Sequence, residues 1–533
     1  MKPEKTVHKT KDNKNVDILL FEKGKRGVLR MLFGRTGIFL FLLLFQIWVL
    51  FNMLRFLETL IPYFVGILAA FTILMVIHVI NTRDNESIKM TWIILITLLP
   101  GYGSMIYLFI RSDLGHRRIK KQLQSVIAES ENEFIPQHQL MHRLYSQNRG
   151  LHNLAIYMEK AGRFPICEKS GTRYFAHGEE AFAEMLLQLE KAESFIFLEY
   201  FIVDEGIMWG RILNTLVKKI KQGVEVRMMY DGTCEFARLP HNYPKKLQQL
   251  GIAAKVFAPL RPFLSTHYNY RDHRKILVID GCVAFTGGMN IADEYINKKE
   301  LFGHWKDTAI MVEGDAVNSF TLMFLQMWNM NETSRTYMTD KYKAKKAKGI
   351  ISGCVLPFGD WPLDDNQAGK AVYMDILDRA EDYVYIMTPY LILDSEIMTS
   401  LQFAAKRGVD VKIILPHIPD KKLVFAQSRS HYCILMKAGV SIYEYTPGFM
   451  HAKVFLSDNK KAVVGTFNLD YRSLYHHFEC AVYMEGTDAI ADIEKDFKKT
   501  LEKCQKVTAE EIKKYNIVMT LIGRILKILA PLM

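Results

Sequence analysis

The chain has 533 residues, of which 49% are hydrophobic and 24% charged, and its formal net charge is +12. This length exceeds one hydrophobic core and predicts two or three units. The positive charge favours anionic partners, either nucleic acid or an anionic lipid surface. Long apolar runs near the N-terminus favour lipid, so we do not expect nucleic acid. Seven cysteines lie scattered without a CxxC pair; they are typical of small buried residues in a reducing compartment, and we expect no metal or other cofactor.

The N-terminal region predicts a multi-pass anchor in the cell membrane. Residues 1–36 carry ten Lys or Arg against four acids, as expected of a cytoplasmic segment before an uncleaved anchor. The membrane region, 37–110, holds three apolar stretches, 37–54, 60–80 and 90–110, each near the roughly 20 residues that span a bilayer. Basic residues flank both ends, so both ends should be cytoplasmic, together with the catalytic part. Three spans cannot do that, and we therefore expect the short first stretch to be irregular.

The soluble part divides into two similar halves. A polar connector, 111–162, leads to the first half, 163–335; a basic linker, 336–350, leads to the second, 351–510. The first half opens with a strand in SFIFLEYFIVD, an amphipathic helix, and a strand in VEVRMMYDG, which predicts a βαβ unit. The second half repeats this order with DYVYIMTPYLILD, a helix through Lys406 and VDVKIILP.

The C-terminal segment, residues 511–533, predicts a basic amphipathic helix. Apolar residues fall on one helical face and basic or polar residues on the other. Such a helix commonly lies in the headgroup region of a membrane. The alternative is a helix that caps the catalytic core.

One motif occurs in both halves. HRKILVIDGCVAFTGGMN, from His273 to Asn290, recurs without gaps as HAKVFLSDNKKAVVGTFN, from His451 to Asn468. Most positions differ between the copies, but the reactive residue types are kept. The recurrence therefore predicts one site built twice, from His273, Lys275, Asp280 and Asn290 of the first copy and His451, Lys453, Asp458 and Asn468 of the second.

The spacing within the motif predicts how these side chains meet. In His-x-Lys, the alternation of a β-strand places both side chains on one face. The Gly-rich turn before each asparagine lets the backbone approach a charged group, for which phosphate is the expected ligand. After the motif, Asp307 aligns with Glu479. A carboxylate in both copies predicts an acceptor that orients an imidazole N–H; the alternative is an ordinary surface acid.

The pattern HxKxxxxD followed by GGxN or GTxN, present twice, resembles the paired motif of the phospholipase D superfamily. The membrane N-terminus, the strings RDHRKILVIDG and AFTGGMNIADEY, and the closing APLM resemble the bacterial cardiolipin synthases. The resemblance implies an α/β fold of two pseudo-symmetric phospholipase D-like α/β/α halves packed together, preceded by N-terminal transmembrane helices.

The resemblance also implies roles for the site residues. His273 would be the nucleophile and His451 the general acid and then base, while the lysines, Asn290, Asn468 and Thr466 would hold the phosphate. Asp280 and Asp458 lie at the far end of the strand and are expected to be structural. Thr466 and the pair His476-His477 depart from the commonest family form.

The implied reaction joins two phosphatidylglycerols into cardiolipin and glycerol. Four alternatives stay open: a phospholipase D-type hydrolase, a phosphatidyltransferase with another alcohol acceptor, a nuclease, and a membrane scaffold without activity. The acceptor alcohol and the oligomeric state are not determined by the residues.

Overall fold

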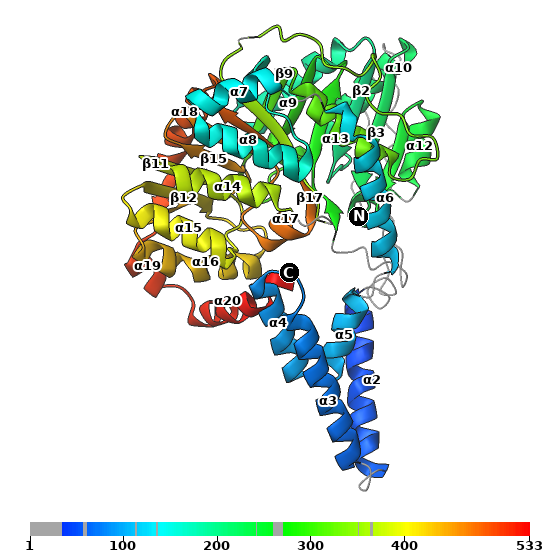
Figure 1. Ribbon diagram of the computed structural model, residues 1–533, viewed down its shortest axis with the longest axis vertical. Helices are drawn as coiled ribbons and strands as arrows, with labels where there is room; N and C mark the ends of the chain where they lie inside the picture. Colours follow the sequence, from blue (N-terminus) through cyan, green and yellow to red (C-terminus); the bar gives the residue numbers. More distant parts are fainter. Residues whose placement is uncertain are drawn as a thin grey trace, which may run out of the picture.

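The computed structural model describes residues 35–56, 61–111, 114–134, 137–240, 242–259, 270–349, 351–362 and 366–532. The basic segment predicted over residues 1–36 therefore lies almost entirely outside the described residues. Two mixed β-sheets stand side by side, with helices on their outer faces (Figure 1). This arrangement confirms the predicted α/β fold of two similar halves after an N-terminal helical region.

The first half is built on a seven-stranded sheet. Its parallel strands β2 and β3 are joined by α10, which is the predicted βαβ unit. The strand order is β1 (Ser170–Phe175), β9 (Ala309–Gly314), β7 (Val283–Gly287), β6 (Lys275–Ile279), β2 (Phe195–Tyr200), β3 (Glu225–Asp231) and β4 (Ala253–Phe257). The helices are α9 (Gly178–Glu190), α10 (Ile207–Lys221), α11 (Thr233–Ala237), α12 (Tyr243–Gln249), the 3-10 turn η3 (Asp293–Ile296) and α13 (Val317–Asn329).

Both faces of this sheet are buried. Ile196 and Leu198 of β2 belong to the core beneath α9 and α10, whereas the alternate residues Phe195 and Phe197 belong to the core shared with the second half. Phe197 stacks on Phe324 of α13, with 4.6 Å between ring centroids. A strand covered on both faces is a continuous apolar run, which is why FIFL shows no polar alternation.

The second half repeats this plan. Its parallel strands β11 and β12 are joined by α15, as predicted. The strand order is β10 (Cys354–Asp360), β17 (His477–Glu485), β16 (Lys461–Gly465), β15 (Val454–Ser457), β11 (Tyr383–Met387), β12 (Asp410–Pro416), β13 (Ser441–Tyr445) and β18 (Cys504–Lys506). The helices are α14 (Ala368–Arg379), α15 (Ser395–Lys406), α16 (Lys422–Lys437), α17 (Tyr471–Tyr475), α18 (Ala489–Leu501) and α19 (Ala509–Lys513).

Among the pairings that cross from one half to the other, two short ones lie just before the motifs. The segment just before the first motif pairs with β17, and the segment just before the second motif pairs with a short strand of the first half. As a result, the backbone N–H of His273 donates to the Phe478 carbonyl at 2.9 Å, and that of His451 donates to the Lys306 carbonyl at 2.8 Å. The crossing strands are β5 (Arg271–Asp272) with β17, and β14 (Gly448–Met450) with β8 (His304–Lys306).

The connector and the linker are more closely packed than their polar composition predicts. The described part of the connector folds into three α-helices and the 3-10 turn η1 (Glu131–Glu133), and its Leu123, Leu144 and Met158 are buried in the main core. In the basic linker, most lysines are exposed, but Tyr342 is buried and the backbone N–H of Lys345 donates to a carbonyl of the first half at 2.8 Å. The connector helices are α6 (Leu114–Glu129), α7 (His138–Gln147) and α8 (Arg149–Gly162).

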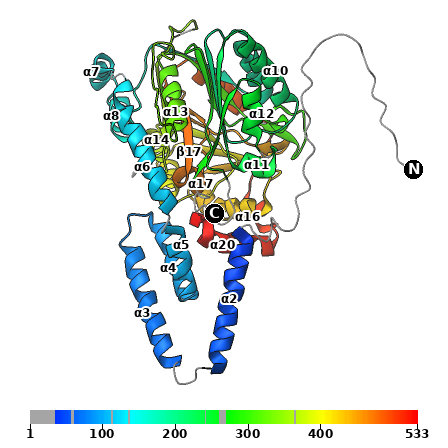
Figure 2. The same cartoon turned by 90° about the vertical axis from the view of Figure 1, so that its right-hand side faces the viewer.

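The N-terminal helices extend away from the sheets (Figure 2). The first apolar stretch, which we expected to be the one that lies in the interface or re-enters the membrane, is one continuous helix, and its place in the membrane stays a prediction. The third stretch is broken instead, because Pro100 cannot continue the helical hydrogen bonding and Gly101 adopts a φ of 77°. Among the described residues, Tyr63–Ile80 is the one helical segment long and apolar enough to cross a bilayer. The helices are α2 (Arg35–Phe56), α3 (Ile61–Ile80), α4 (Glu86–Leu98) and α5 (Tyr102–Arg111).

The C-terminal helix α20 (Ile517–Leu529) lies beside α4 at the base of these helices (Figure 1). Its Gly523 packs against the backbone of α16, where a Cβ would lie 2.3 Å from the Ala426 carbonyl oxygen. The Thr91 hydroxyl of α4 donates to the Ile528 carbonyl at 2.7 Å. The opposite side of α20 exposes the apolar residues Ile517, Val518, Leu521, Ile525 and Ile528.

Candidate active site

The two motif histidines are each paired with a buried carboxylate of the other half. Nδ1 of His273 lies 2.9 Å from both carboxylate oxygens of Glu479, and Nδ1 of His451 lies 2.6 Å from Oδ2 of Asp307. Both histidines are buried, and both carboxylates are fully inaccessible to solvent. The exchanged strands β5 and β14 produce this pairing, because each brings a histidine alongside the strand that leads into the partner carboxylate. Nδ1 faces the carboxylate in each ring, which leaves Nε2 for a substrate.

Local groups fix both carboxylates in place. Glu479 accepts hydrogen bonds from the hydroxyls of Ser473 and Thr466. Oδ1 of Asp307 accepts the backbone N–H of the next residue at 2.8 Å. The Gly-rich turn makes room for this carboxylate, since a Cβ on Gly288 would lie 2.1 Å from Oδ1 of Asp307. The glycine was expected to admit a phosphate; in the structure it admits the carboxylate that orients an imidazole.

The His-x-Lys segments are only partly strands. β6 begins at Lys275 and β15 at Val454, so the predicted strand alternation does not place the histidine and lysine on one face. The histidine backbone instead bonds to the other half. Each lysine turns back toward its histidine: Nζ of Lys275 donates to the His273 carbonyl at 2.5 Å, and Nζ of Lys453 lies 2.9 Å from Nδ1 of His451.

Burial controls the protonation of these four groups. It lowers the pKa of Lys275 to about 8 and that of Lys453 to about 7. Burial, and then the charge of the neighbouring lysine, lowers the pKa of His451 to about 4 and that of His273 well below its usual range. Lys453 and His451 also lower the pKa of His273, so groups of both motifs act on one another. Near neutral pH the empty site therefore holds two uncharged imidazoles and two lysines close to deprotonation.

The side chain of each motif aspartate accepts hydrogen bonds from three consecutive backbone N–H groups. Asp280 accepts the backbone N–H groups of residues 193–195 at 2.7 to 2.8 Å, and Asp458 accepts those of residues 381–383 at 2.9 to 3.0 Å. Both adopt the left-handed conformation, with φ near 55°. They hold the end of one strand to the beginning of another, which agrees with the structural role expected of them.

The predicted phosphate-binding residues differ in their contacts. Asn290 uses both ends of its amide internally: Oδ1 accepts the Ile202 N–H at 3.0 Å and Nδ2 donates to the Tyr295 hydroxyl at 2.7 Å. Oδ1 of Asn468 is buried without a hydrogen-bond partner in the part of the chain that the structure describes. The Thr466 hydroxyl contacts Glu479 rather than the space beside the imidazoles.

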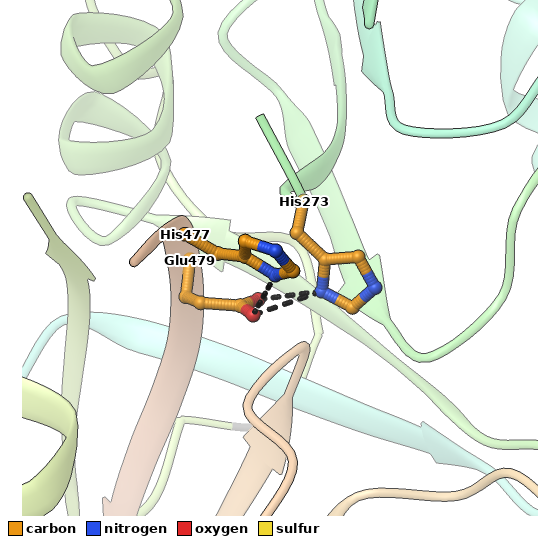
Figure 3. A group of neighbouring side chains, drawn as sticks. All are labelled: His273, His477 and Glu479. Carbon is orange, nitrogen blue, oxygen red and sulfur yellow. Dashed lines mark hydrogen bonds and ion pairs between the residues drawn. The ribbon is translucent and has the colours of Figure 1, made fainter. Parts of the chain in front are cut away.

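Two residues of this site were not singled out as members of it from the sequence. Ser473 holds Glu479, and the ring of His477 lies beside His273, with 5.4 Å between centroids (Figure 3). The internal repeat could have pointed to His477. The alignment that pairs Asp307 with Glu479 also pairs Trp305 with His477, so an aromatic ring stands two positions before the carboxylate in both halves. The spacing in the sequence showed no cluster of metal ligands, whereas the fold brings His273, His477 and Glu479 together.

Comparisons with known proteins agree with this fold and site. The family model of the cardiolipin synthase, phospholipase D-like domain matches residues 185–328 and 373–501, and the model of the phospholipase D-nuclease N-terminal domain matches residues 70–111. A protein of Streptococcus mutans serotype c without an assigned function is 51% identical over 86% of this chain and 99% of its own length. A cardiolipin synthase of Alkalihalophilus pseudofirmus is 34% identical over 89% of this chain and 93% of its own.

A likeness to a solved structure supports the fold alone. The phosphatidylserine synthase of Haemophilus influenzae superposes with a TM-score of 0.55, covering 72% of this chain and 99% of its own at 13% identity. The two-sheet fold with one histidine motif in each half, taken with these matches, defines a phosphatidyltransferase of the phospholipase D superfamily. Within that superfamily, the chain belongs to the cardiolipin synthase family.

Proposed function

We propose that this protein makes cardiolipin by transferring a phosphatidyl group from one phosphatidylglycerol to another, with glycerol as the second product. The observation that carries the proposal is the reciprocal pairing of His273 with Glu479 and of His451 with Asp307. Because each pair needs both halves, the two motifs form one site with two oriented imidazoles. Two such rings supply the nucleophile and the proton carrier that a double displacement requires.

The reaction then has two steps. Nε2 of His273 attacks the phosphorus of the donor lipid, the bond to the headgroup glycerol oxygen breaks, and protonated His451 gives this oxygen its proton. The hydroxyl of the acceptor lipid next loses its proton to His451 and attacks the phosphohistidine, whose phosphorus–nitrogen bond breaks. The negative charge of the phosphodiester supports the first step, because it raises the pKa of His451 from its low value in the empty site.

The lysines stabilise the charge that develops on the phosphoryl oxygens. Lys275 and Lys453 are buried beside the histidines, and a bound phosphate anion favours their charged forms. We infer that the side-chain amide of Asn468 joins them. Preorganised donors of this kind are worth about 3 to 4 kcal/mol each where they have been measured in other enzymes.

The direct test is to express the full chain in a cell that lacks cardiolipin and to identify the lipids by mass spectrometry. We expect cardiolipin to appear while phosphatidylglycerol falls. Phosphatidic acid without cardiolipin would instead mean that water is the acceptor, and a different phosphatidyl alcohol would identify another acceptor.

Replacing Glu479 with glutamine is expected to lower kcat by about 10² to 10⁴, since an uncharged partner no longer stabilises the charged ring or fixes its tautomer. KM should change little, because the ring acts in the transition state rather than in substrate binding. Steady-state kinetics and thermal unfolding of the purified protein measure both effects. The matched control is Glu381→Gln, an exposed glutamate whose ion pair with Lys460 lies on the surface. Equal activity in Glu479→Gln and the control would contradict the proposal that Glu479 orients the ring of His273.

We infer that the 22-residue helix α2 crosses the bilayer beside α3, although α3 alone passes the length and hydropathy criteria over its described residues. Two spans put the basic segment before residue 37 and the basic residues after residue 110 on the same side of the bilayer, which removes the conflict that three spans create. The exposed apolar side of α20, contiguous with α4, lies in the headgroup region with Arg524 and Lys527 toward lipid phosphates. Donor and acceptor lipids then meet the site at the membrane surface.

The catalytic halves are expected to face the cytoplasm. A cysteine at the exposed position of Lys345, introduced in a Cys433→Ser background that removes the exposed native cysteine, should react with a membrane-impermeant maleimide only after cells are permeabilised. Labelling is read by mass shift on a gel. Rapid labelling in intact cells would place the halves outside.

A further inference from the structure

His273, His477 and Glu479 form a compact group of ligand atoms (Figure 3). Nδ1 of His273 lies 2.9 Å from Glu479, Nδ1 of His477 lies 3.7 Å from Oε1 of the same carboxylate, and one ligand atom from each residue lies within 4.8 Å of the others. The carboxylate therefore has an imidazole nitrogen on each side. The proposed mechanism uses His273 and Glu479 but gives no role to His477.

Within the described ranges, the ring of His477 lies buried without a hydrogen-bond partner. Both of its nitrogens are buried without a partner among the described residues, and the side chain is 10% exposed. Buried imidazole nitrogens in proteins are normally satisfied, so such a ring is a candidate to bind a ligand. The ring packs against aromatic neighbours: its centroid lies 5.4 Å from His273 and 6.5 Å from Phe201.

The other half provides an internal comparison. The position equivalent to His477 is Trp305, whose ring lies 5.3 Å from His451 in a similar tilted arrangement. An aromatic ring beside the motif histidine is thus common to both halves, and packing alone does not require an imidazole there. The feature specific to His477 is a ring nitrogen with a free lone pair that can bind a metal, because a Trp ring offers an N–H donor and no metal ligand.

We propose that His273, His477 and Glu479 bind one Zn²⁺ ion, and that the bound ion switches the enzyme off. Two imidazoles and one carboxylate with an open fourth position are a ligand set that zinc accepts, at bond lengths of about 2.0 to 2.2 Å. A tetrahedral ion with such bonds needs ligand atoms about 3.3 Å apart. Oε1 of Glu479 lies 2.9 Å from Nδ1 of His273 and 3.7 Å from Nδ1 of His477, and the ligand atoms of all three residues lie within 4.8 Å of one another. Mg²⁺ and Ca²⁺ prefer all-oxygen sites and are not expected to compete.

Inhibition follows from the tautomer of His273. In the metal-free site, Nδ1 carries the ring proton toward Glu479 and Nε2 keeps the lone pair that attacks phosphorus. When zinc occupies Nδ1, the ring proton moves to Nε2 and this lone pair is no longer available. This inhibitory effect rests on the proposed function, whereas zinc binding itself does not.

The experiment uses the full chain in detergent micelles. ZnCl₂ titrated by calorimetry into chelator-treated protein should bind at one ion per chain. Loss of a direct ligand in His477→Phe should weaken this binding by more than the about 10- to 100-fold that loss of an outer partner costs in other metal sites. His477→Gln serves as a second variant if the phenylalanine protein is unstable, and Trp305→Phe, the matched change beside His451, should bind zinc like the unaltered protein.

Cardiolipin formation measured on the same samples gives the second readout. Zinc should inhibit the unaltered protein, a chelator should restore its activity, and each His477 variant should keep its own metal-free rate when zinc is added. Absence of stoichiometric binding, or equal binding by the unaltered protein and the His477 variants, would overturn the proposed site. Binding that depends on His477 without loss of turnover would overturn the inhibition. An inactive protein that still binds zinc through His477 would contradict the proposed synthase function and leave this site intact.

Discussion

Replacing either His273 or His451 with alanine should abolish cardiolipin formation, with a loss of at least about 10⁴ in rate, because a nucleophile or a proton carrier is removed from both displacements. The double variant should be no worse than the more impaired single variant, since residues that act as a unit show strongly non-additive losses. Lipid analysis of cells and of the purified protein measures these rates.

The matched control for this pair is His138→Ala, an exposed histidine on α7 away from both motifs. It should leave synthesis unchanged. All variants should remain folded and in the membrane fraction, because each substitution removes one ring without altering the exchanged backbone pairings β5–β17 and β14–β8. Substantial synthesis by one of the two histidine variants would contradict a site shared between the halves.

The two histidines should differ when the leaving group needs no proton. With a phosphatidyl nitrophenol as donor, His451→Ala should release about one equivalent of nitrophenol per enzyme in a burst and then stall, because the first displacement proceeds but the acceptor lacks its base. His273→Ala should release none, since it has no nucleophile. Stopped-flow absorbance of nitrophenolate measures the burst.

The unaltered protein and His138→Ala are the references for this burst, and both should turn over continuously. A burst in His273→Ala together with none in His451→Ala would exchange the two roles within the same scheme. The Nδ1–carboxylate pairs are so alike, at 2.9 and 2.6 Å, that their geometry does not assign the roles. The assignment rests on the family resemblance, and the burst is therefore the decisive measurement.

The local elements were predictable because their signals are local. The apolar run from Ile276 to Ile279 is β6, and the paired strands around α10 and α15 follow the repeat read from the residues. Strand and helix periodicity is encoded within a few neighbouring positions, so a single sequence is enough. The site residues of the two motifs were also predictable from the sequence. The ungapped repeat keeps His, Lys, Asp and Asn at the same positions, while most other positions differ between the copies.

The errors share one physical cause. The histidines were expected on the strands of their own lysines, and the third apolar stretch was treated as one segment near the length of a membrane span. In both places, the local structure depends on something other than the spacing of apolar residues. The backbone of His273 bonds to β17, and α4 ends just before Pro100 and Gly101. Periodicity describes which face of an element is buried but does not identify its partner.

The sequence by itself determined that this protein has an α/β fold of two similar halves, an apolar helical region before them, and one site supplied by two motifs. Only the tertiary structure decided which carboxylate serves which histidine. Glu479 pairs with His273 across 206 positions and Asp307 with His451 across 144. Such contacts depend on how β5 and β14 each pair with a strand of the other half, and this exchange leaves no periodic pattern in either segment. The same exchange brings His477 beside His273, because distant strands become neighbours only when both halves have folded together.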